Sequence, residues 1–400
     1  MYSVGIDISK SKSTVAIMAP YGEVIRTPFD ITHTEPGLSA LVEVLSSLNG
    51  EVRIVMESTG AYHLPVLNYL KERGFFVSVV NPLVIQKYVA MNIRKAKTDR
   101  IDALKIACFG IDYWQHLVDF SPADETYAEL RLLSRQYLHY IGMLKDAKLN
   151  LTNLMDQVLP GIKPMLKSQT RASGKNILCD FVEKFWHLDV ITKMSEEKFV
   201  IVYVVWAKKK GHHYNETKAR GLHASALEGI PTLSSHTPST KMLVLEAVHA
   251  LQNAEKTLAI ILTRMQQLAK SLKEYEVVRA MPGVGDTLAP RIIAEVGDIR
   301  RFHSGSALVA FAGIDAPPYQ SGTINMTNRH ISKRGSSSLR RTGYEIMQCI
   351  KIVQPTSDDA VYKFMLKKES EGKPKKAAKI AAFNKFLRIY YARVNALYSA

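Results

Sequence analysis

The chain has 400 residues, of which 46% are hydrophobic and 22% are charged, so we expect two or three folded domains and exclude wholesale disorder. Its 53 Lys and Arg against 37 Asp and Glu give a formal net charge of +16, which favours a polyanionic partner, nucleic acid before a membrane. No apolar run approaches the roughly 18 residues of a membrane span, and no signal-peptide pattern is present, so we expect a cytoplasmic protein. The isolated Cys108, Cys179 and Cys349 form no zinc motif.

Residues 1 to about 110 alternate between strand and helix patterns. Two short strands around a polar turn predict a hairpin, and a third extended stretch follows before the first helix. Helix, strand, helix, strand and helix come next, which predicts a mixed α/β sheet of ribonuclease H type. The predicted elements are strands at Val4–Ser9, Ser13–Met18, Glu23–Ile31, Val52–Met56 and Phe75–Val80, and helices at Pro36–Leu48, Tyr62–Arg73 and after Pro82.

Two long helices are predicted in the middle of the chain, at about 121–158 and 241–275. The second carries apolar residues at alternating steps of three and four, the heptad seam of a coiled coil, at Leu258, Ile261, Met265, Leu268 and Leu272. An intramolecular helical hairpin and a dimer contact both fit this seam. Residues 162–240 between the helices are the least readable, and Phe199–Trp206 fits either a buried strand or a helix.

From about residue 276 the sequence contains glycine-rich turns and a run of basic residues. Met281–Gly285 followed by Thr287–Val296 indicates a helix–hairpin–helix, in which Gly283 and Gly285 permit a tight turn and free amides face phosphate. An ordinary helix connector is the alternative. Farther on, a basic run supplies candidate nucleic-acid contacts at Arg329, Lys333, Arg334, Arg340 and Arg341, with His330 among them. A last amphipathic helix is predicted at about 376–397.

Four carboxylates stand out in the first part of the chain. Asp7 is the one charge in the first strand, and Gly5 before it lets another backbone come close. Glu57 ends a strand predicted to lie beside the first, and Asp99 and Asp102, three residues apart, share one face of a helix start. Metal-assisted phosphoryl chemistry needs such hard oxygen ligands from different segments, so we predict a divalent metal site.

Each carboxylate also has a plain structural alternative. Asp7 fits a satisfied sheet-edge residue, Glu57 fits a cap for the helix after it, and Asp99 with Asp102 fits a capping arrangement. The cations around the last pair would hold phosphate next to the metal, and they are Arg94, Lys95, Lys97 and Arg100.

These motifs carry a family resemblance. GIDISK with Asp7, MESTG with Glu57, and KTDRIDA with Asp99 and Asp102 resemble the DEDD motif of the insertion sequence 110 family of transposases. MPGVG, FAGIDAPPYQSG and RHISKRGSSSLRR are similar to that family's C-terminal transposase domain. The resemblance covers about 1–160 and 240–400, and residues 162–240 match nothing in the family.

The resemblance implies a RuvC-like catalytic domain at 1–120, a helical coiled-coil region at 121–275 with an insert at 162–240, and a mostly helical transposase domain at 276–400. It implies a prokaryotic, nucleoid-associated recombinase that cuts and rejoins double-stranded donor and target DNA, guided by a structured non-coding bridge RNA. Ser321 matches the family's catalytic serine, which forms a phosphoserine link to DNA. The carboxylates would hold Mg²⁺ (or Mn²⁺), and a site shared between subunits implies a dimer or tetramer.

Rival interpretations remain open from the sequence. Ser321 beside a glycine fits ordinary turn chemistry, and a metal-dependent nuclease like a Holliday-junction resolvase would need no such serine. A site-specific DNA invertase of the same family is a close variant that the sequence alone does not exclude. A nucleic-acid-binding protein without catalysis is disfavoured, because four carboxylates without metal would weaken phosphate binding.

Overall fold

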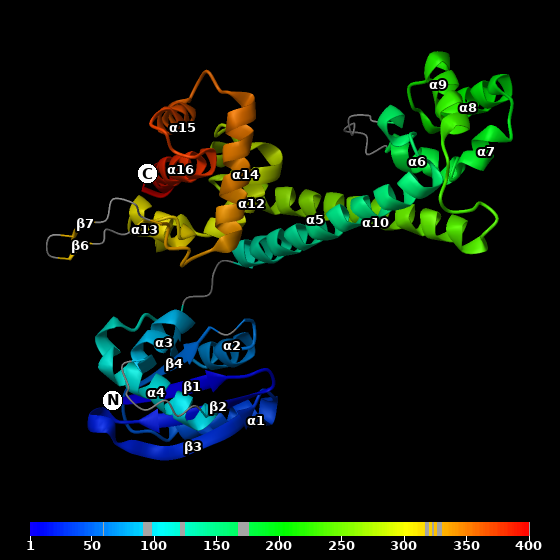
Figure 1. Cartoon of the computed structure of the whole chain (residues 1–400). Helices are drawn as coiled ribbons and strands as arrows, with labels where there is room; N and C mark the ends of the chain where they lie inside the picture. The colour runs from blue at the N-terminus through cyan, green and yellow to red at the C-terminus, as the bar shows by residue number, and fades with distance from the viewer. Residues whose placement is uncertain are drawn as a thin grey trace. The chain divides into compact units, whose positions relative to one another are not determined.

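The computed structural model describes residues 1–58, 60–90, 98–120, 125–166, 176–316, 320–321, 324–325 and 330–399 (Figure 1). The chain divides into two compact units, residues 1–122 and 123–400. Across the described ranges, no helix combines the length and hydropathy that a bilayer span requires.

A mixed five-stranded sheet forms the centre of the first unit, in the order β3-β2-β1-β4-β5. The first three strands pair antiparallel, whereas β4 runs parallel to β1 and β5 runs parallel to β4. This is the meander followed by parallel strands that the sequence predicts. The strands are β1 Tyr2–Ile8, β2 Lys12–Met18, β3 Val24–Thr32, β4 Val52–Glu57 and β5 Phe76–Val80.

Helices cover both faces of this sheet. The helices α1 Glu35–Ser46 and α2 Leu64–Glu72 pack through apolar side chains such as Leu41 and Leu67 onto the face that includes Ile6. The other face is covered by α3 Pro82–Ala90 and α4 Asp99–Asp112. Both faces are therefore buried, as expected when parallel strands occur in the sheet.

Helix α4 lies directly on the backbone of β1. A Cβ atom added at Gly5 would come within 2.3 Å of the Ala103 carbonyl oxygen and of the Ala107 amide nitrogen. One added at Gly110 would come within 2.1 Å of the Ser3 hydroxyl. Helix α4 therefore runs antiparallel to β1, and its first turn lies toward the end of the strand that carries Asp7.

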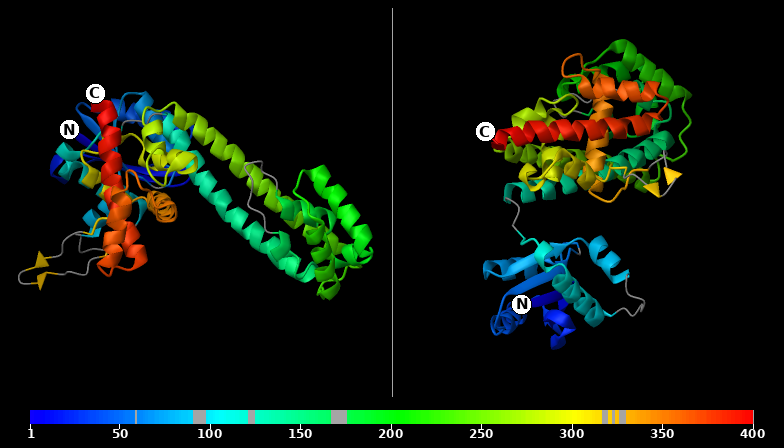
Figure 2. Two further views of the ribbon diagram at one scale, coloured as in Figure 1. Left: turned by 90° about the horizontal axis from the view of Figure 1, so that it is seen from above. Right: turned by 90° about the vertical axis from the view of Figure 1, so that its left-hand side faces the viewer.

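The second unit is built along two long antiparallel helices, α5 Glu125–Val158 and α10 Pro238–Lys270 (Figures 1 and 2). At one end they pack with α6 Ile177–Lys184, α7 Leu188–Thr192, α8 Glu196–Lys210 and α9 Glu216–Glu228. At the other end lie α11 Tyr275–Arg279, α12 Gly285–Val296, α13 Gly305–Ala312, α14 Ser337–Val353, α15 Ala360–Ser370 and α16 Lys375–Ser399. A small hairpin consists of β6 Gln320–Ser321 and β7 Ile324–Asn325.

The predicted heptad residues of α10 pack against other residues of the same chain. Leu258 and Met265 are buried in one core with Tyr127 and Leu130 of α5, and the other seam residues pack against that core. An ion pair of 2.9 Å between Arg264 and Glu129 links the same two helices. Helix α10 ends at Lys270 instead of continuing to Tyr275, which begins the separate α11.

Candidate active site

Asp7 and Glu57 end two neighbouring parallel strands. The register places Ile6 of β1 opposite Met56 of β4, so the next residue of each strand, Asp7 and Glu57, also lie side by side. Ile6 and Met56 belong to the core beneath α1 and α2. Because side chains alternate along a strand, the two half-buried carboxylates lie on the opposite face, the one that α4 covers.

The register extends this pair into a row across four strands. Asp7 lies opposite Thr14 of β2, and Thr14 lies opposite Asp30 of β3. The Thr14 hydroxyl donates a hydrogen bond of 2.7 Å to Asp30, and the Lys12 ammonium lies 3.1 Å from the other carboxylate oxygen. The bond from Thr14, followed by that from Lys12, lowers the pKa of Asp30.

Asp30 is a carboxylate that motif reading of the sequence missed. It lies in no recognisable motif, and only the pairing of the third strand with the predicted hairpin identifies its place in the row.

The first turn of α4 supplies the other two carboxylates. Thr98 caps the helix, because its hydroxyl accepts a hydrogen bond from the Ile101 amide. Asp99 and Asp102 follow in the first turn, where the helix dipole favours negative charge, and Asp102 lies 3.3 Å from Lys105. The N-cap role belongs to Thr98, and the N-cap position of α2 is His63, so none of the predicted carboxylates occupies an N-cap position.

A pocket of about 330 Å³ joins this turn to the row on the sheet. It is lined by Asp99, Arg100 and Thr98 from the helix side and by Lys12, Thr14 and Asp30 from the strands. Asp99 and Arg100 therefore face the row across a space that is open to solvent.

The carboxylate oxygens are the hard ligands that Mg²⁺ and Mn²⁺ prefer, so the donor chemistry of the row fits a divalent cation. Within the described ranges, however, no three acidic, histidine or cysteine side chains lie together as a metal site requires. The structure thus brings Asp7 beside Glu57 and places the turn of Asp99 and Asp102 on the same face, but it does not close the four into one ligand set.

Ser321 lies in the β6–β7 hairpin of the second unit, opposite Ile324. The segments before and after this hairpin, residues 311–315 and 332–336, contact each other, and we call these two segments the neck. The Ser332 hydroxyl donates to the Asp315 carboxylate at 2.5 Å, and the Lys333 amide donates to the Gly313 carbonyl at 3.0 Å. Backbone approach at the neck is so close that a Cβ at Gly335 would meet the Phe311 oxygen at 2.3 Å.

Arg340 belongs to this neck. Its guanidinium donates to the carbonyl oxygens of Ala312, at 3.0 Å, and Gly335, at 3.2 Å, and so bridges the two sides. The neighbouring Arg341 is exposed and lies 3.4 Å from Glu345. Lys333 and Arg334 are also exposed. Other predicted phosphate contacts lie outside the described residues, namely Arg94, Lys95, Lys97 and Arg329.

The two predicted turn glycines have different surroundings. Both have positive φ, but a Cβ at Gly283 would meet Ile350 of α14 at 2.5 Å, whereas Gly285 faces open space. Asp286 occupies the first turn of α12 and pairs with Arg279. A carboxylate at this helix start lowers its attraction for phosphate, so the phosphate contact remains a prediction.

Positive charge is divided unequally between the units. Residues 1–122 contain 12 basic and 12 acidic residues, whereas residues 123–400 contain 41 and 25. The second unit therefore accounts for the whole net charge of +16, and the first unit, which holds the row of carboxylates, has no net charge.

Comparison with known families identifies both ends of the chain. Residues 4–160 match a DEDD family of the IS110 type described as transposase, and residues 275–362 match a family described as transposase IS116/IS110/IS902. Residues 161–274 lie between these two matches.

Several curated proteins are similar to the chain. The insertion element IS110 43.6 kDa protein of Streptomyces coelicolor is 22% identical, over 84% of this chain and 81% of that protein. The pilin gene-inverting protein of Moraxella bovis is 22% identical, over 97% and 94%. The transposase for insertion sequence element IS1111A of Coxiella burnetii is 31% identical, over 32% and 36%.

Among solved structures, Thermus thermophilus RuvC in complex with a Holliday junction substrate is similar at 14% identity and a TM-score of 0.23. The similarity covers 29% of this chain and 96% of the RuvC chain.

Proposed function

The chain belongs to the IS110 family of transposases, enzymes that recombine DNA, and on this premise we propose that it cuts and rejoins DNA strands through a phosphoserine intermediate with divalent-metal assistance. The observation that carries the proposal is the row on the sheet: Asp7 and Glu57 lie side by side on the face that the Asp99–Asp102 turn covers. Two carboxylates that lie side by side repel each other, and a bound cation would offset that repulsion.

The residues proposed to hold the metal are Asp7, Glu57, Asp99 and Asp102. A bound Mg²⁺ or Mn²⁺ would neutralise charge that develops on the phosphate. Arg100, at the edge of the pocket beside Asp99, is placed to attract the neighbouring phosphate of the strand.

Ser321 is proposed as the nucleophile. Its Oγ would form a bond to the scissile phosphorus while the bond to the leaving deoxyribose oxygen breaks, and that oxygen would take up a proton. Attack on the phosphoserine by the hydroxyl of another strand would reverse the chemistry and release the serine. Each step exchanges one phosphodiester for another, so rejoining requires no ATP.

Three further features of the proposal come from the family. A structured guide RNA would choose donor and target DNA, a homo-oligomer would assemble the site from the carboxylates of one subunit and the serine of another, and the α5–α10 pair would act as a coiled-coil connection. The large positive excess of residues 123–400 supports binding to the phosphates of DNA and RNA.

Inversion of a DNA segment is the second candidate. It is favoured by the Moraxella bovis relative, named a pilin gene-inverting protein, which is matched along 94% of its length. Inversion and transposition share the cutting and rejoining steps and differ in the arrangement of the DNA sites.

A covalent-adduct assay tests the proposal. The full chain would be produced together with the non-coding flanks of its element and mixed with labelled junction DNA and Mg²⁺. We expect denaturant-resistant label on the protein, lost in Ser321→Ala and Asp7→Asn, lost with EDTA and lost after RNase treatment. The matched controls are Ser306→Ala and Glu43→Gln, exposed residues away from the site, which should retain the adduct.

Metal-dependent cleavage without an adduct, unchanged in Ser321→Ala, would replace the proposal with a resolvase-like nuclease. An adduct that survives RNase would remove the RNA guide and leave the serine chemistry. A DNA substrate with two inverted sites separates the second candidate, because an invertase reverses the segment between them without excising it.

A further inference from the structure

Arg301 presents its guanidinium group against two aromatic rings beside the neck. It ends the short 3₁₀ turn Ile299–Arg301 that follows α12. The central guanidinium carbon lies 4.6 Å from the centre of the Phe302 ring and 4.4 Å from that of Phe311, and the two ring centres are 5.3 Å apart. Cation–π contacts with both rings hold the group in place. The residue is exposed, so an approaching ligand can reach it.

No carboxylate among the described residues forms an ion pair with Arg301. Asp298, just before it in the sequence, is already held by Arg300, whose Nε lies 3.0 Å from both carboxylate oxygens and whose Nη2 lies 2.7 Å from Oδ2. Glu295 is buried and accepts from the Ser336 hydroxyl at 3.3 Å. The acidic residues nearest to Arg301 in the sequence are therefore engaged elsewhere.

The carbonyl groups at the end of α13 do not serve Arg301 either. The Phe311 oxygen accepts from the Ser336 amide at 2.8 Å, and the Ala312 oxygen accepts from Arg340 at 3.0 Å. The guanidinium of Arg301 thus has N–H donors that no described residue uses.

A second cation increases the positive charge at this place. Arg131 of α5 lies against Gly297, where an added Cβ would come within 2.9 Å of its Nη2, and its Nε donates to the Ala294 oxygen at 3.3 Å. The buried Glu295 offsets part of its charge. Loss of solvent, followed by the charge of Arg131, lowers the pKa of Arg301 to about 10. A bound anion would offset this repulsion between like charges.

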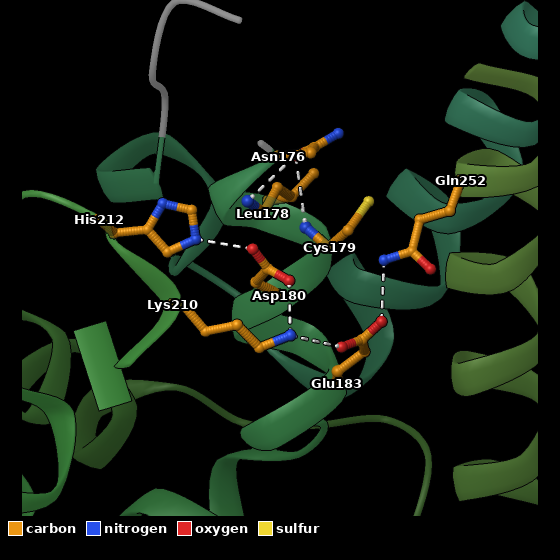
Figure 3. Close-up of polar contacts among 8 residues, drawn as sticks. All are labelled: Asn176, Leu178, Cys179, Asp180, Glu183, Lys210, His212 and Gln252. Carbon is orange, nitrogen blue, oxygen red and sulfur yellow. Dashed lines mark hydrogen bonds and ion pairs between the residues drawn. The ribbon is translucent and has the colours of Figure 1, made fainter. Parts of the chain in front are cut away.

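A cation of the insert shows the opposite environment (Figure 3). Lys210 lies 2.8 Å from Asp180 and 3.3 Å from Glu183, and the hydrogen bond to Asp180 raises its pKa. The charge of Lys210 is thus satisfied within the chain. Arg301 differs, because the rings that hold it leave its charge and its N–H donors free for a ligand.

We propose that Arg301 binds a phosphate group of the DNA backbone, with Arg131 adding to the local positive charge. A guanidinium held in one orientation offers a planar set of donors that suits two phosphate oxygens. Phe311, one of the supporting rings, belongs to the neck, so the bound phosphate would lie beside the neck.

The choice of DNA rests on the proposed function. RNA carries the same phosphate chemistry, but the neck flanks the segment that carries Ser321, and the proposed target of Ser321 is a DNA strand. A phosphate held beside the neck would help to bring that strand to the segment.

Binding of labelled duplex DNA to the full chain, followed by fluorescence anisotropy in EDTA over a range of salt concentrations, tests this contact. We expect Arg301→Gln to lower the slope of log affinity against log salt by about 1 and the affinity by about tenfold. Arg301→Lys keeps the charge but not the planar donors, so it should keep the slope and lose part of the affinity. Arg301→Gln breaks no hydrogen bond or ion pair of the described residues, so its melting temperature should equal that of the wild type.

Arg220→Gln is the matched control, because it removes the same charge from an exposed arginine that pairs with Glu196. It should leave the slope unchanged. Because EDTA prevents cutting, Ser321→Ala should bind as the wild type does, and a failure of the proposed chemistry would leave these binding results unaffected.

Three results would each overturn the proposal: a wild-type slope in Arg301→Gln, an equal decrease in Arg220→Gln, or a loss of affinity for a labelled RNA hairpin without a loss for DNA.

Discussion

Gly5 is the residue that brings the first turn of α4 onto the same face as Asp7. A methyl group there would lie 2.3 Å from backbone atoms of Ala103 and Ala107, which cannot rotate away. We therefore expect Gly5→Ala to push α4 off the strand and to destabilise the first unit by about 1–3 kcal/mol. Urea unfolding followed by circular dichroism measures this loss, and adduct formation should fall with it because Asp99 and Asp102 move.

Gly142→Ala is the comparison for this glycine. Gly142 lies in α5, and no other described segment comes within 4 Å of the added carbon, so alanine should be neutral or stabilising by up to about 1 kcal/mol. Equal effects of the two substitutions would contradict the close packing of α4 on β1.

Two histidines of the first unit should make its stability depend on pH. Burial lowers the pKa of both His33 and His63. A histidine with a lowered pKa binds fewer protons in the folded state, so its contribution to stability is present above about pH 6.5 and is lost as the pH falls below that value. The melting temperature should therefore drop between about pH 7.5 and pH 5.5.

His63→Phe should reduce this drop, because it removes a buried imidazole whose Nδ1 has no hydrogen-bond partner among the described residues. His116→Phe, at an exposed position of the same unit, reports the effect on stability of losing a histidine that is not buried. A pH dependence of the same size in both variants and in the wild type would show that other groups cause it.

At the scale of elements, sequence patterns predict the sheet because β1, β2, β4 and β5 are largely apolar and buried, whereas β3 is mostly exposed and buries Ile31. Pro36 in the first turn and the apolar spacing of Leu38, Leu41 and Leu45 likewise identify α1. Helix α8 is different: its run of β-branched and aromatic residues fits a strand equally well, and the cap at Ser195 and the left-handed Gly211 decide for a helix. Those signals are local, but the buried partners that stabilise α8 come from distant segments.

The candidate site could be predicted only in part. The order of elements alone predicts Asp7 and Glu57 on adjacent strands, and the register agrees. Asp30 and the bridging role of Arg340 were not predictable, because each depends on which residues the pairing of distant segments brings opposite one another.

The neck that flanks the Ser321 hairpin should depend on Arg340. A single guanidinium nitrogen, Nη1, donates to both Ala312 and Gly335, and a lysine side chain, which is one atom shorter, does not bring its ammonium to the same point between the two carbonyls. We expect Arg340→Lys to lower the yield of the covalent adduct about tenfold, since the neck at the base of the segment that carries Ser321 loses its bridge. Arg341→Lys, an exposed neighbour with one i,i+4 contact to Glu345, should keep the wild-type yield, and equal losses in both would remove Arg340 from the positioning role.

At the scale of the whole molecule, the excess positive charge is concentrated near the C-terminus. Residues 276–400 contain 20 basic and 10 acidic residues. The helical part of the insert, residues 176–237, contains 8 and 7, and residues 162–175 before it add four basic residues. Phosphate contacts release counterions, so the affinity of a basic surface for DNA falls steeply with salt. The distribution of charge therefore predicts that α15 and α16 contact nucleic acid and that helices α6 to α9 of the insert do not.

Paired substitutions test this distribution. Lys375 and Lys376 at the start of α16 are exposed, as are Lys193 and Lys198 of the insert, and reversing either pair to Glu changes the net charge equally. We expect Lys375→Glu/Lys376→Glu to reduce the slope of log affinity against log salt by about 1–2 and Lys193→Glu/Lys198→Glu to leave it unchanged. Fluorescence anisotropy with labelled duplex DNA measures both slopes. Equal reductions would mean that total charge, and not its location on α16, governs binding.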